Sequence, residues 1–238
     1  MTGHPDLIQD LVDANHILFH QGVVDAFGHV SVRHPHIRNR FYLARNMAPA
    51  SVAYDDILEF DLDVGAIDAA GRRVYLEWFI HGEIFRARPD VMAVVHSHSP
   101  SLVPFTVVPS VPFRPLCHMC GFLGEGAARF EIRDAGGPRT DLLIRDSRLG
   151  HALANCLSTH NVVLMRGHGS TVVGPSLKQA VYRAVYTEVN AKLLSSALRI
   201  GPIEYLSVEE AHAALAIEAE IERPWQFWKS EARGSRTP

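Results

Sequence analysis

The chain has 238 residues, of which 47% are hydrophobic and 21% are charged, and its formal net charge is −3. This composition is typical of a globular protein with enough apolar material for a large core. A slightly acidic chain without an interior basic run is not expected to bind nucleic acid or an anionic membrane. Because it has no stretch of about 18 apolar residues and no signal-peptide pattern, the sequence predicts a cytoplasmic protein.

No linker rich in glycine, serine or proline interrupts the pattern, so we expect one domain over residues 1–238, with a short polar tail from about residue 229. Three cysteines are too few for a disulfide framework in a chain of this length. Cys117 and Cys120 form a single CxxC pair before Gly121, which favours a loop. A structural zinc site would need a second pair, and a thioredoxin-type motif would need a helix that starts there, so neither role is favoured.

The periodicity of apolar residues predicts regular elements along the first part of the chain. They are a helix at 5–21, strands at 28–33, 41–44 and 57–60, and a helix from Glu77 to a stop at Pro89. In the first of these strands, Val30 and Val32 alternate with polar residues, which is typical of a half-buried strand. Glu77 falls in the first turn of its helix, where the helix macrodipole favours a carboxylate.

An apolar run at 91–95 leads into His96-Ser97-His98 and is stopped by Pro100. Its β-branched residues predict a buried strand. Residues two apart in a strand share a face, so His96 and His98 are expected to project the same way, about 6–7 Å apart. Such a pair can bind one divalent metal ion but needs at least a third ligand. The alternative is a pair of solvated or structurally satisfied histidines.

The rest of the chain alternates strands and helices on a similar scale. The predicted elements are an edge strand at 130–132, a helix at 149–157, a buried strand at 161–165, a long helix between Pro175 and Gly201, and a helix at about 208–222. This alternation predicts an α/β protein in which a sheet is covered by helices on both faces.

His168 is the candidate third ligand, because it follows a buried strand and stands between Gly167 and Gly169. The flanking glycines allow special backbone dihedrals and a close approach by another group. The alternative is an ordinary turn histidine. Glu77 could complete the site as a metal ligand or as a general acid or base, and it could equally be an ordinary glutamate at a helix start.

The order of these motifs along the chain resembles the class II aldolase/adducin family over roughly residues 7–220. The motifs that carry the resemblance are Gly28-x-Val30-Ser31, Ala48-Pro49-Ala50-Ser51, Tyr75-Leu76-Glu77, His96-Ser97-His98 and Gly167-His168-Gly169. The resemblance implies a three-layer α/β/α fold around a mixed, largely antiparallel sheet, and a homotetramer with active sites at subunit interfaces. It also implies one divalent metal ion per chain, bound by His96, His98 and His168. Glu77 would be a further ligand or the group that transfers a proton.

The departures from the family pattern argue against a phosphorylated substrate. Sugar-phosphate aldolases of the family hold phosphate with an asparagine, a Thr-Pro-Ser/Thr-Gly loop and a serine pair before the glutamate. The corresponding positions here are His29, Ala48-Pro49-Ala50-Ser51 and Tyr75-Leu76. Most of the hydroxyls, and the glycine, that would hold a phosphate group are therefore replaced. The metal-binding set is intact, which argues against the non-catalytic, adducin-like branch.

Three further segments resemble decarboxylases that act on hydroxylated aromatic or pyridine carboxylates. They are Phe27-Gly28-His29-Val30-Ser31, Arg45-Asn46-Met47-Ala48 and His118-Met119-Cys120-Gly121-Phe122-Leu123-Gly124. The resemblance implies a carboxy-lyase of aromatic-compound catabolism that uses Mn²⁺ or Zn²⁺, with Fe²⁺ and Co²⁺ as further options. Loss of CO2 leaves charge on a substrate oxygen, which the metal would stabilise as an enolate or phenolate.

Proton transfer and substrate binding complete the predicted site. Glu77 is the first candidate for the acid that protonates the ring carbon, and His29 and His118 are the alternatives. An arginine can bind a second carboxylate of the substrate bidentately, or it can be a structural residue. The residues predicted to bind the substrate are Arg45, Ser51 and Arg166.

Three function classes remain open. The first is a metal-dependent decarboxylase of an ortho-hydroxylated aromatic or pyridine (di)carboxylate. The second is a class II metal-dependent aldolase, an aldehyde-lyase, that acts on a non-phosphorylated hydroxy-carbonyl substrate. The third is a non-catalytic interaction module. Trp225, Phe227 and Trp228 indicate a covered surface near the C-terminus, either in an oligomer or against the chain's own core.

Overall fold

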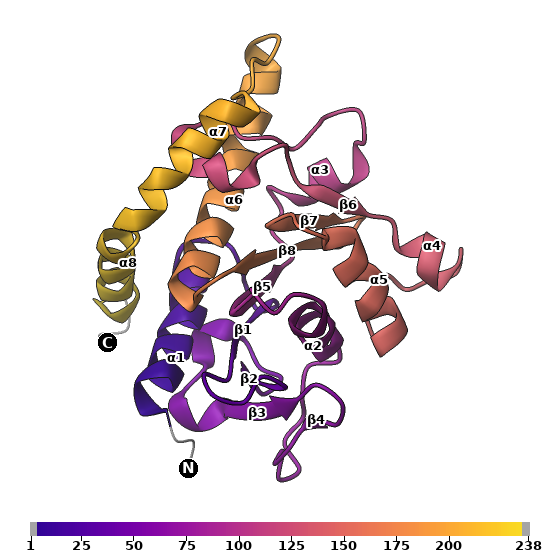
Figure 1. Ribbon diagram of the computed structural model, residues 1–238, viewed down its shortest axis with the longest axis vertical. Coiled ribbons are helices and arrows are strands. Elements are labelled where there is room, and N and C mark those ends of the chain that lie inside the picture. The colour runs from indigo at the N-terminus through magenta and orange to yellow at the C-terminus, as the bar shows by residue number, and fades with distance from the viewer. Residues whose placement is uncertain (1–3, 235–238) are drawn as a thin grey trace.

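The computed structural model describes residues 4–234, which form one eight-stranded sheet with helices on both faces (Figure 1). The strand order is β4-β3-β2-β1-β5-β8-β7-β6. Neighbouring strands are antiparallel, except that β6 and β7 are parallel. The strands are β1 His29–Arg33, β2 Arg40–Ala44, β3 Ile57–Asp61, β4 Gly65–Ala66, β5 Ala93–Ser97, β6 Ala128–Phe130, β7 Val162–Met165 and β8 Gly169–Gly174.

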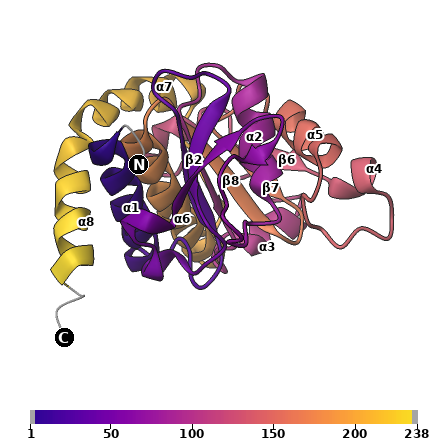
Figure 2. The same cartoon turned by 90° about the horizontal axis from the view of Figure 1, so that it is seen from below.

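Two groups of helices enclose the sheet. Helices α1 (Pro5–His20) and α6 (Leu177–Ile200) lie on one face, with α8 (Glu222–Gly234) packed outside them against α1 (Figure 1, Figure 2). Helices α2 (Trp78–Ala87) and α5 (Ser147–Leu157) pack against each other on the opposite face. The short helices are α3 Val103–Val107, α4 Ile132–Gly136 and α7 Val208–Ala214, and the 3-10 helices are η1 Pro49–Ser51, η2 Tyr54–Asp56, η3 His118–Leu123 and η4 Leu215–Glu220.

This arrangement confirms the predicted three-layer α/β/α fold with a mixed, largely antiparallel sheet. The helices expected at 5–21, from Glu77 and at 149–157, the long helix before Gly201, and the strands up to 161–165 are present, with their ends shifted by one or two residues. A single domain over the whole chain stays a prediction. Within residues 4–234, no helix combines the length and the apolar surface that crossing a membrane requires.

Strand β8 was not among the strands expected from the sequence. It lies between β5 and β7 in the middle of the sheet, and all its residues are buried. A strand that is buried on both faces shows no alternation of polar and apolar residues. Ser170 and Thr171 are therefore core residues here, opposite Ser97 and His96 of β5.

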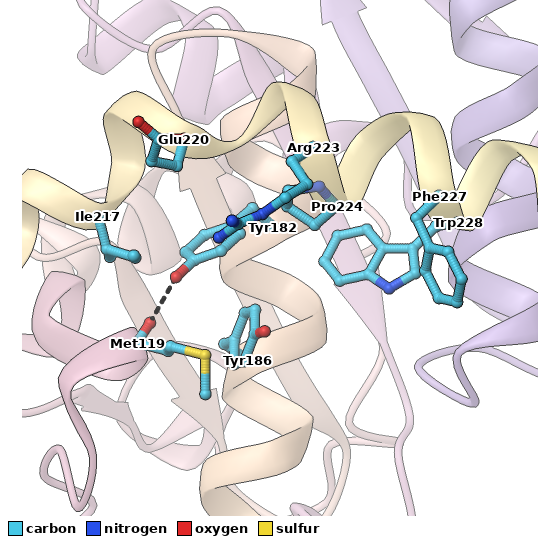
Figure 3. A pocket seen from close by; sticks show the side chains of 9 residues that line it. All are labelled: Met119, Tyr182, Tyr186, Ile217, Glu220, Arg223, Pro224, Phe227 and Trp228. Atoms are coloured by element: carbon cyan, nitrogen blue, oxygen red, sulfur yellow. Dashed lines mark hydrogen bonds between the residues drawn. The ribbon is translucent and has the colours of Figure 1, made fainter.

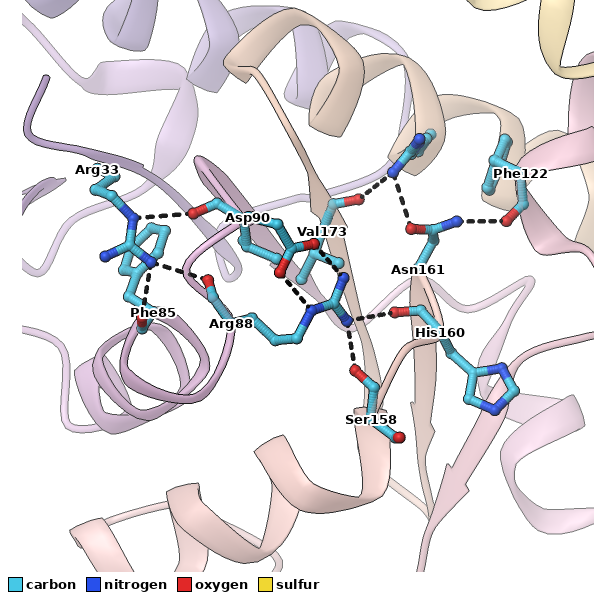
Figure 4. A network of polar contacts seen from close by, with 11 residues as sticks. Arg33, Phe85, Arg88, Asp90, Phe122, Ser158, His160, Asn161 and Val173 are labelled. Atoms are coloured by element: carbon cyan, nitrogen blue, oxygen red, sulfur yellow. Dashed lines mark hydrogen bonds and ion pairs between the residues drawn. The ribbon is translucent and has the colours of Figure 1, made fainter. Parts of the chain in front are cut away.

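Strand β1 was expected to be half-buried, and this was wrong, because all five of its residues are buried. Helix α2 covers the face that was expected to meet solvent: both His29 and Ser31 contact His81 of α2. Arg33 is the last residue of β1, and its side chain donates hydrogen bonds to the carbonyl groups of Val91, Arg38, Phe85 and Arg88. Figure 4 shows this arginine and Arg88, which both donate to backbone carbonyl groups at that end of the sheet.

The remaining differences concern short elements, such as β4, α3 and α4, and the ends of longer ones. Strand β6 is at Ala128–Phe130 instead of 130–132, because the Glu131 side chain caps helix α4 and Ile132 begins it. The helix expected at about 208–222 is divided into α7 and the 3-10 helix η4, and α8 follows.

The polar segment expected to be a tail from about residue 229 is part of helix α8 as far as Gly234. Lys229 forms an ion pair with Asp13 of α1 at 2.8 Å, and Arg233 forms one at 3.0 Å. Ala232 is buried between them. Lys229 and Arg233 thus attach this helix to α1 through ion pairs. The last part of the predicted tail, residues 235–238, lies outside the described residues.

Close packing at the start of β8 predicts a specific sensitivity. A side chain on Gly169 would overlap the Ser97 carbonyl group and crowd His98. We expect Gly169→Ala to reduce the free energy of unfolding by about 1–3 kcal/mol, as overpacking of a core does. Gly201→Ala is the control, because a Cβ there meets no atom within 4 Å and its backbone is extended. Urea denaturation measures both, and equal stabilities of the two variants would contradict the prediction.

Candidate metal centre

Four side chains singled out from the sequence meet at the end of β5: Glu77, His96, His98 and His168. One potential ligand atom from each lies within 4.8 Å of all the others. The Nε2 atoms of His96 and His98 are 2.9 Å apart, and those of His98 and His168 are also 2.9 Å apart. The Glu77 Oε2 atom lies 3.4 Å from Nε2 of His168 and 3.8 Å from Nε2 of His96.

The sheet brings the three histidines together from two segments. His96 is the fourth residue of β5, and its neighbours in the sheet are His29 of β1 and Thr171 of β8. His98 comes just after the end of β5, and His168 comes just before the start of β8. Because β5 and β8 are antiparallel neighbours, the end of one strand lies beside the start of the other.

Glu77 does not act as an ordinary helix cap. It is the N-cap residue of α2, but its side chain makes no capping hydrogen bond. Instead, Oε1 accepts a hydrogen bond of 2.8 Å from the backbone N–H of Ile144. This contact fixes the carboxylate so that Oε2 faces the histidines.

Hydrogen bonds to the far side of two rings decide which nitrogen faces the cluster. Nδ1 of His168 lies 2.8 Å from the Leu142 carbonyl oxygen, which can only accept, so Nδ1 carries the hydrogen. Nδ1 of His96 lies 3.3 Å from the Thr171 hydroxyl, whose own hydrogen is donated to Met165. In the neutral rings, Nε2 of both histidines therefore presents a lone pair to the cluster.

This donor set fits a divalent cation. His98 can donate a hydrogen to only one of its two neighbours, so at least one close pair of nitrogens has no hydrogen between them. Burial lowers the pKa of His96 and of His98, which keeps both rings in the neutral form that ligates metals. Facing lone pairs beside a carboxylate repel one another, and a cation among them removes that repulsion.

His29, a predicted catalytic residue, lies beside the cluster. Its ring centroid is 5.0 Å from that of His96, and its Nδ1 atom lies 2.6 Å from Nε2 of His81. His81 in turn contacts the Ser31 hydroxyl through Nδ1, also at 2.6 Å. Burial lowers the pKa of His29 and that of His81, the latter to about 3.

His81 was missed in the sequence analysis, although a signal existed. It lies four residues after Glu77, and such residues lie on the same face of a helix. Together with Ser31 it holds the His29 ring through Nδ1. The other ring nitrogen of His29, Nε2, is therefore the one left for a substrate.

A cavity of about 260 Å³ adjoins the cluster. Its lining residues are Ala26, Phe27, Gly28, His29, Asn46, Met47, Ala48, Tyr75, Leu76, Glu77, His98 and Leu143. Most of these side chains are apolar or aromatic, and the polar ones are His29, Asn46, Glu77 and His98. Apolar walls with a few convergent polar groups are typical of a small-molecule site.

The predicted substrate-binding residues do not line this cavity within the described chain. Arg45 pairs with Asp56, with Nε and Oδ1 2.6 Å apart, and Arg166 pairs with Glu131, with Nε and Oε2 2.8 Å apart. Ser51 is exposed at the end of η1. His118, a predicted alternative acid, is exposed at the start of η3 and is not among the lining residues either.

Comparisons with known proteins identify similar sequences. Residues 9–195 match the family described as Class II Aldolase and Adducin N-terminal domain. The chain is 36% identical to "Decarboxylase tropJ" of Talaromyces stipitatus, with 94% of this chain and 93% of that protein aligned. It is 32% identical to a 3,4-dihydroxyphthalate decarboxylase of Arthrobacter keyseri, with 74% and 73% aligned.

Solved structures share the fold. An aldolase II superfamily protein from Pseudomonas syringae superposes with a TM-score of 0.82 at 18% identity, over 99% of this chain and 96% of that one. An L-fuculose 1-phosphate aldolase from Glaciozyma antarctica superposes with a TM-score of 0.77 at 22% identity, over 97% and 89%. At these identities, the likeness shows the fold alone.

The geometry predicts that His168→Ala weakens metal binding. The substitution removes one of three converging nitrogens, and we expect a loss of metal affinity of about 10-fold or more. His151→Ala is the matched control, because His151 is exposed on α5 and outside the cluster. Elemental analysis after dialysis against a weak chelator measures both. Full metal occupancy in His168→Ala would remove this residue from the site.

Proposed function

The chain belongs to the class II aldolase and adducin family, and from this premise we propose that it is a metal-dependent decarboxylase of an ortho-hydroxylated aromatic or pyridine carboxylate. Its relatives named as decarboxylases support a carboxy-lyase. The observation that carries the proposal is the mostly apolar cavity that meets three histidines and a glutamate at one end. A flat ring fits such walls, and its carboxylate and neighbouring hydroxyl suit the polar end.

We propose one divalent ion per chain, held by His96, His98 and His168 with Glu77 as a further ligand or neighbour. Mn²⁺ and Zn²⁺ are the first candidates, and Fe²⁺ and Co²⁺ also suit nitrogen and oxygen ligands. When bound, the ion supplies a Lewis acid for the negative charge that develops on the substrate as CO2 leaves.

The apolar side chains of the cavity would orient the ring and keep water away. Phe27, Met47, Leu76 and Leu143 supply most of this surface. The Tyr75 hydroxyl is held by the Met47 carbonyl group, so the aromatic face of Tyr75 is the part that meets the cavity. Excluding water strengthens every electrostatic interaction at the polar end.

Protonation of the ring carbon is the step that a protein side chain must supply. Glu77 is our first candidate, because Ile144 fixes one carboxylate oxygen and leaves the other beside the cavity. His29 is the alternative, because it lines the cavity and its Nε2 atom is not engaged by His81. His118 of the same chain does not line the cavity, which leaves it without a part in this proposal.

A metal-dependent aldolase that acts on a non-phosphorylated hydroxy-carbonyl compound is the second candidate. The same centre would stabilise the charge formed when a carbon–carbon bond next to a carbonyl group is cleaved. A relative named as an aldolase, 30% identical over 64% of this chain, supports this alternative. The apolar cavity walls favour the decarboxylase, because a carbohydrate needs more hydrogen-bonding groups.

A homotetramer also remains a proposal. Of the three aromatic residues that motivated it, Trp225 and Trp228 are buried within their own chain, and only Phe227 is exposed among them. Phe227 is therefore the one of these three residues that still supports an oligomer, because a partner subunit would cover its exposed side chain.

The proposed function predicts a substrate preference. Ortho-hydroxylated aromatic or pyridine carboxylates should release CO2 with the metal-loaded protein, and the same rings without the hydroxyl should react far more slowly. Ketose and aldose phosphates should be poor substrates, because the phosphate-binding groups are replaced. Coupled CO2 detection and aldehyde detection measure the two reactions. Efficient cleavage of a sugar phosphate would instead favour the aldolase.

Glu77→Gln should keep most of the metal and lose most of the turnover. The amide preserves the shape but removes the charge and the transferable proton, and loss of a general acid costs about 10²–10⁴-fold in rate. Glu83→Gln is the control, because Glu83 is a buried glutamate of the same helix outside the cluster. Metal content, melting temperature and CO2 release are measured on one preparation. Near-normal turnover in Glu77→Gln would refute the catalytic role.

A further inference from the structure

Cys117 and Cys120 of the CxxC pair form a close dithiol, and the proposed reaction at the metal centre uses neither cysteine. The Sγ atoms of Cys117 and Cys120 are 3.3 Å apart. The Cys120 N–H donates a hydrogen bond of 2.9 Å to the Cys117 carbonyl oxygen, so the pair spans one tight turn. Such a turn holds its end residues within about 7 Å, which is close to the Cα separation that a disulfide requires.

The two thiols differ in their surroundings. Cys117 is partly exposed, whereas Cys120 is completely buried and contacts the Tyr186 carbonyl oxygen. The contact between the two sulfur atoms lowers the pKa of Cys117 to about 6. The same contact, together with burial, raises the pKa of Cys120. An accessible, ionisable sulfur thus lies beside a buried one that can react only with its neighbour.

The surroundings favour a disulfide over a metal site. A structural metal needs about four ligands. Within residues 4–234, the histidine and glutamate cluster at β5 is the only group of three or more His, Cys, Asp or Glu side chains with converging ligand atoms. A redox role was not favoured from the sequence, because no helix was expected after Cys117. The structure differs here, since the 3-10 helix η3 begins at His118.

We propose that Cys117 and Cys120 are a thiol–disulfide exchange site that reacts reversibly with low-molecular-weight disulfides such as oxidised glutathione. The Cys117 thiolate attacks one sulfur of the small disulfide, and one small thiolate leaves. The Cys120 thiol loses its proton and attacks Cys117 Sγ, which expels the second small thiolate. The protein gains a disulfide, two small thiols form, and the two electrons pass from the dithiol to the small disulfide.

The backbone can accommodate this reaction with local changes. The sulfurs must approach from 3.3 Å to about 2 Å, which side-chain rotation can supply. Cys120 then loses its contact with the Tyr186 carbonyl group. Tyr186 and Met119, one of the two residues between the cysteines, line one groove together with Tyr182, whose hydroxyl donates to the Met119 carbonyl group (Figure 3). Oxidation therefore takes place at the edge of this groove.

The experiment equilibrates the metal-loaded protein, without oxygen, in glutathione buffers of increasing oxidised-to-reduced ratio. Remaining thiols are alkylated, and mass spectrometry assigns the state of each cysteine. We expect the peptide with Cys117 and Cys120 to lose two hydrogens with rising ratio and to return on reduction. Cys156, which is also partly exposed and whose pKa burial raises, is the internal control and should stay alkylatable.

Two variants test the order of events. Cys120→Ser should retain a glutathione adduct on Cys117, because no second thiol can displace it, and Cys117→Ser should form neither adduct nor disulfide. The proposal would be overturned if both cysteines could still be alkylated at the most oxidising ratio. It would also be overturned by a persistent adduct on Cys117 in the unmodified chain. So would oxidation of Cys156 at the same ratio. The result for the unmodified chain is decisive even if a variant folds poorly.

Discussion

The mutual repulsion of converging imidazole lone pairs and a carboxylate at the end of β5 is the constraint around which the structure is built. Three ring nitrogens and one carboxylate oxygen are held within 4.8 Å of one another. Ring lone pairs and a carboxylate in such proximity repel one another unless a cation lies among them. Several elements meet at this point: the strands on both sides of β5, the start of α2 and the loop before β8. The fold therefore holds these groups close together in spite of their mutual repulsion.

The polar side chains at the two ends of the central strands have different roles. At one end, Arg33 donates to four backbone carbonyl groups, and Arg88 reaches the Ser158 and His160 carbonyl groups beyond them. These contacts satisfy buried polar groups and serve stability. At the other end, His29 and His96 are paired neighbours in the sheet, and their ring centroids are 5.0 Å apart. His29 lines the adjoining cavity, and His96 belongs to the cluster of potential metal ligands.

Burial connects this geometry to the proposed chemistry. It lowers the pKa of His29, His81 and His96, so the rings stay neutral near pH 7 and keep lone pairs for a metal or a substrate proton. The apolar side chains that line the adjoining cavity suit an aromatic ring. The dithiol at Cys117 follows a different rule: one sulfur is buried and the other is partly exposed, and this asymmetry is what exchange chemistry requires.

Apolar periodicity predicted the α/β class and most of the elements, and the HxH spacing and the flanking glycines singled out His96, His98 and His168 as candidate ligands, because these are local signals. The inclusion of Glu77 and the largely antiparallel sheet came from the order of the motifs, which resembles the family. Local signals do not report which distant side chains come together. The strand at 169–174 was missed, because a strand buried on both faces loses its alternation, and the partners of Arg45 and Arg166 depend on loops far away in the chain. Only the tertiary structure decided that His81 holds His29, that Glu77 faces the histidines, and that the cavity excludes the two arginines, since each depends on how α2 and the loops pack against the sheet.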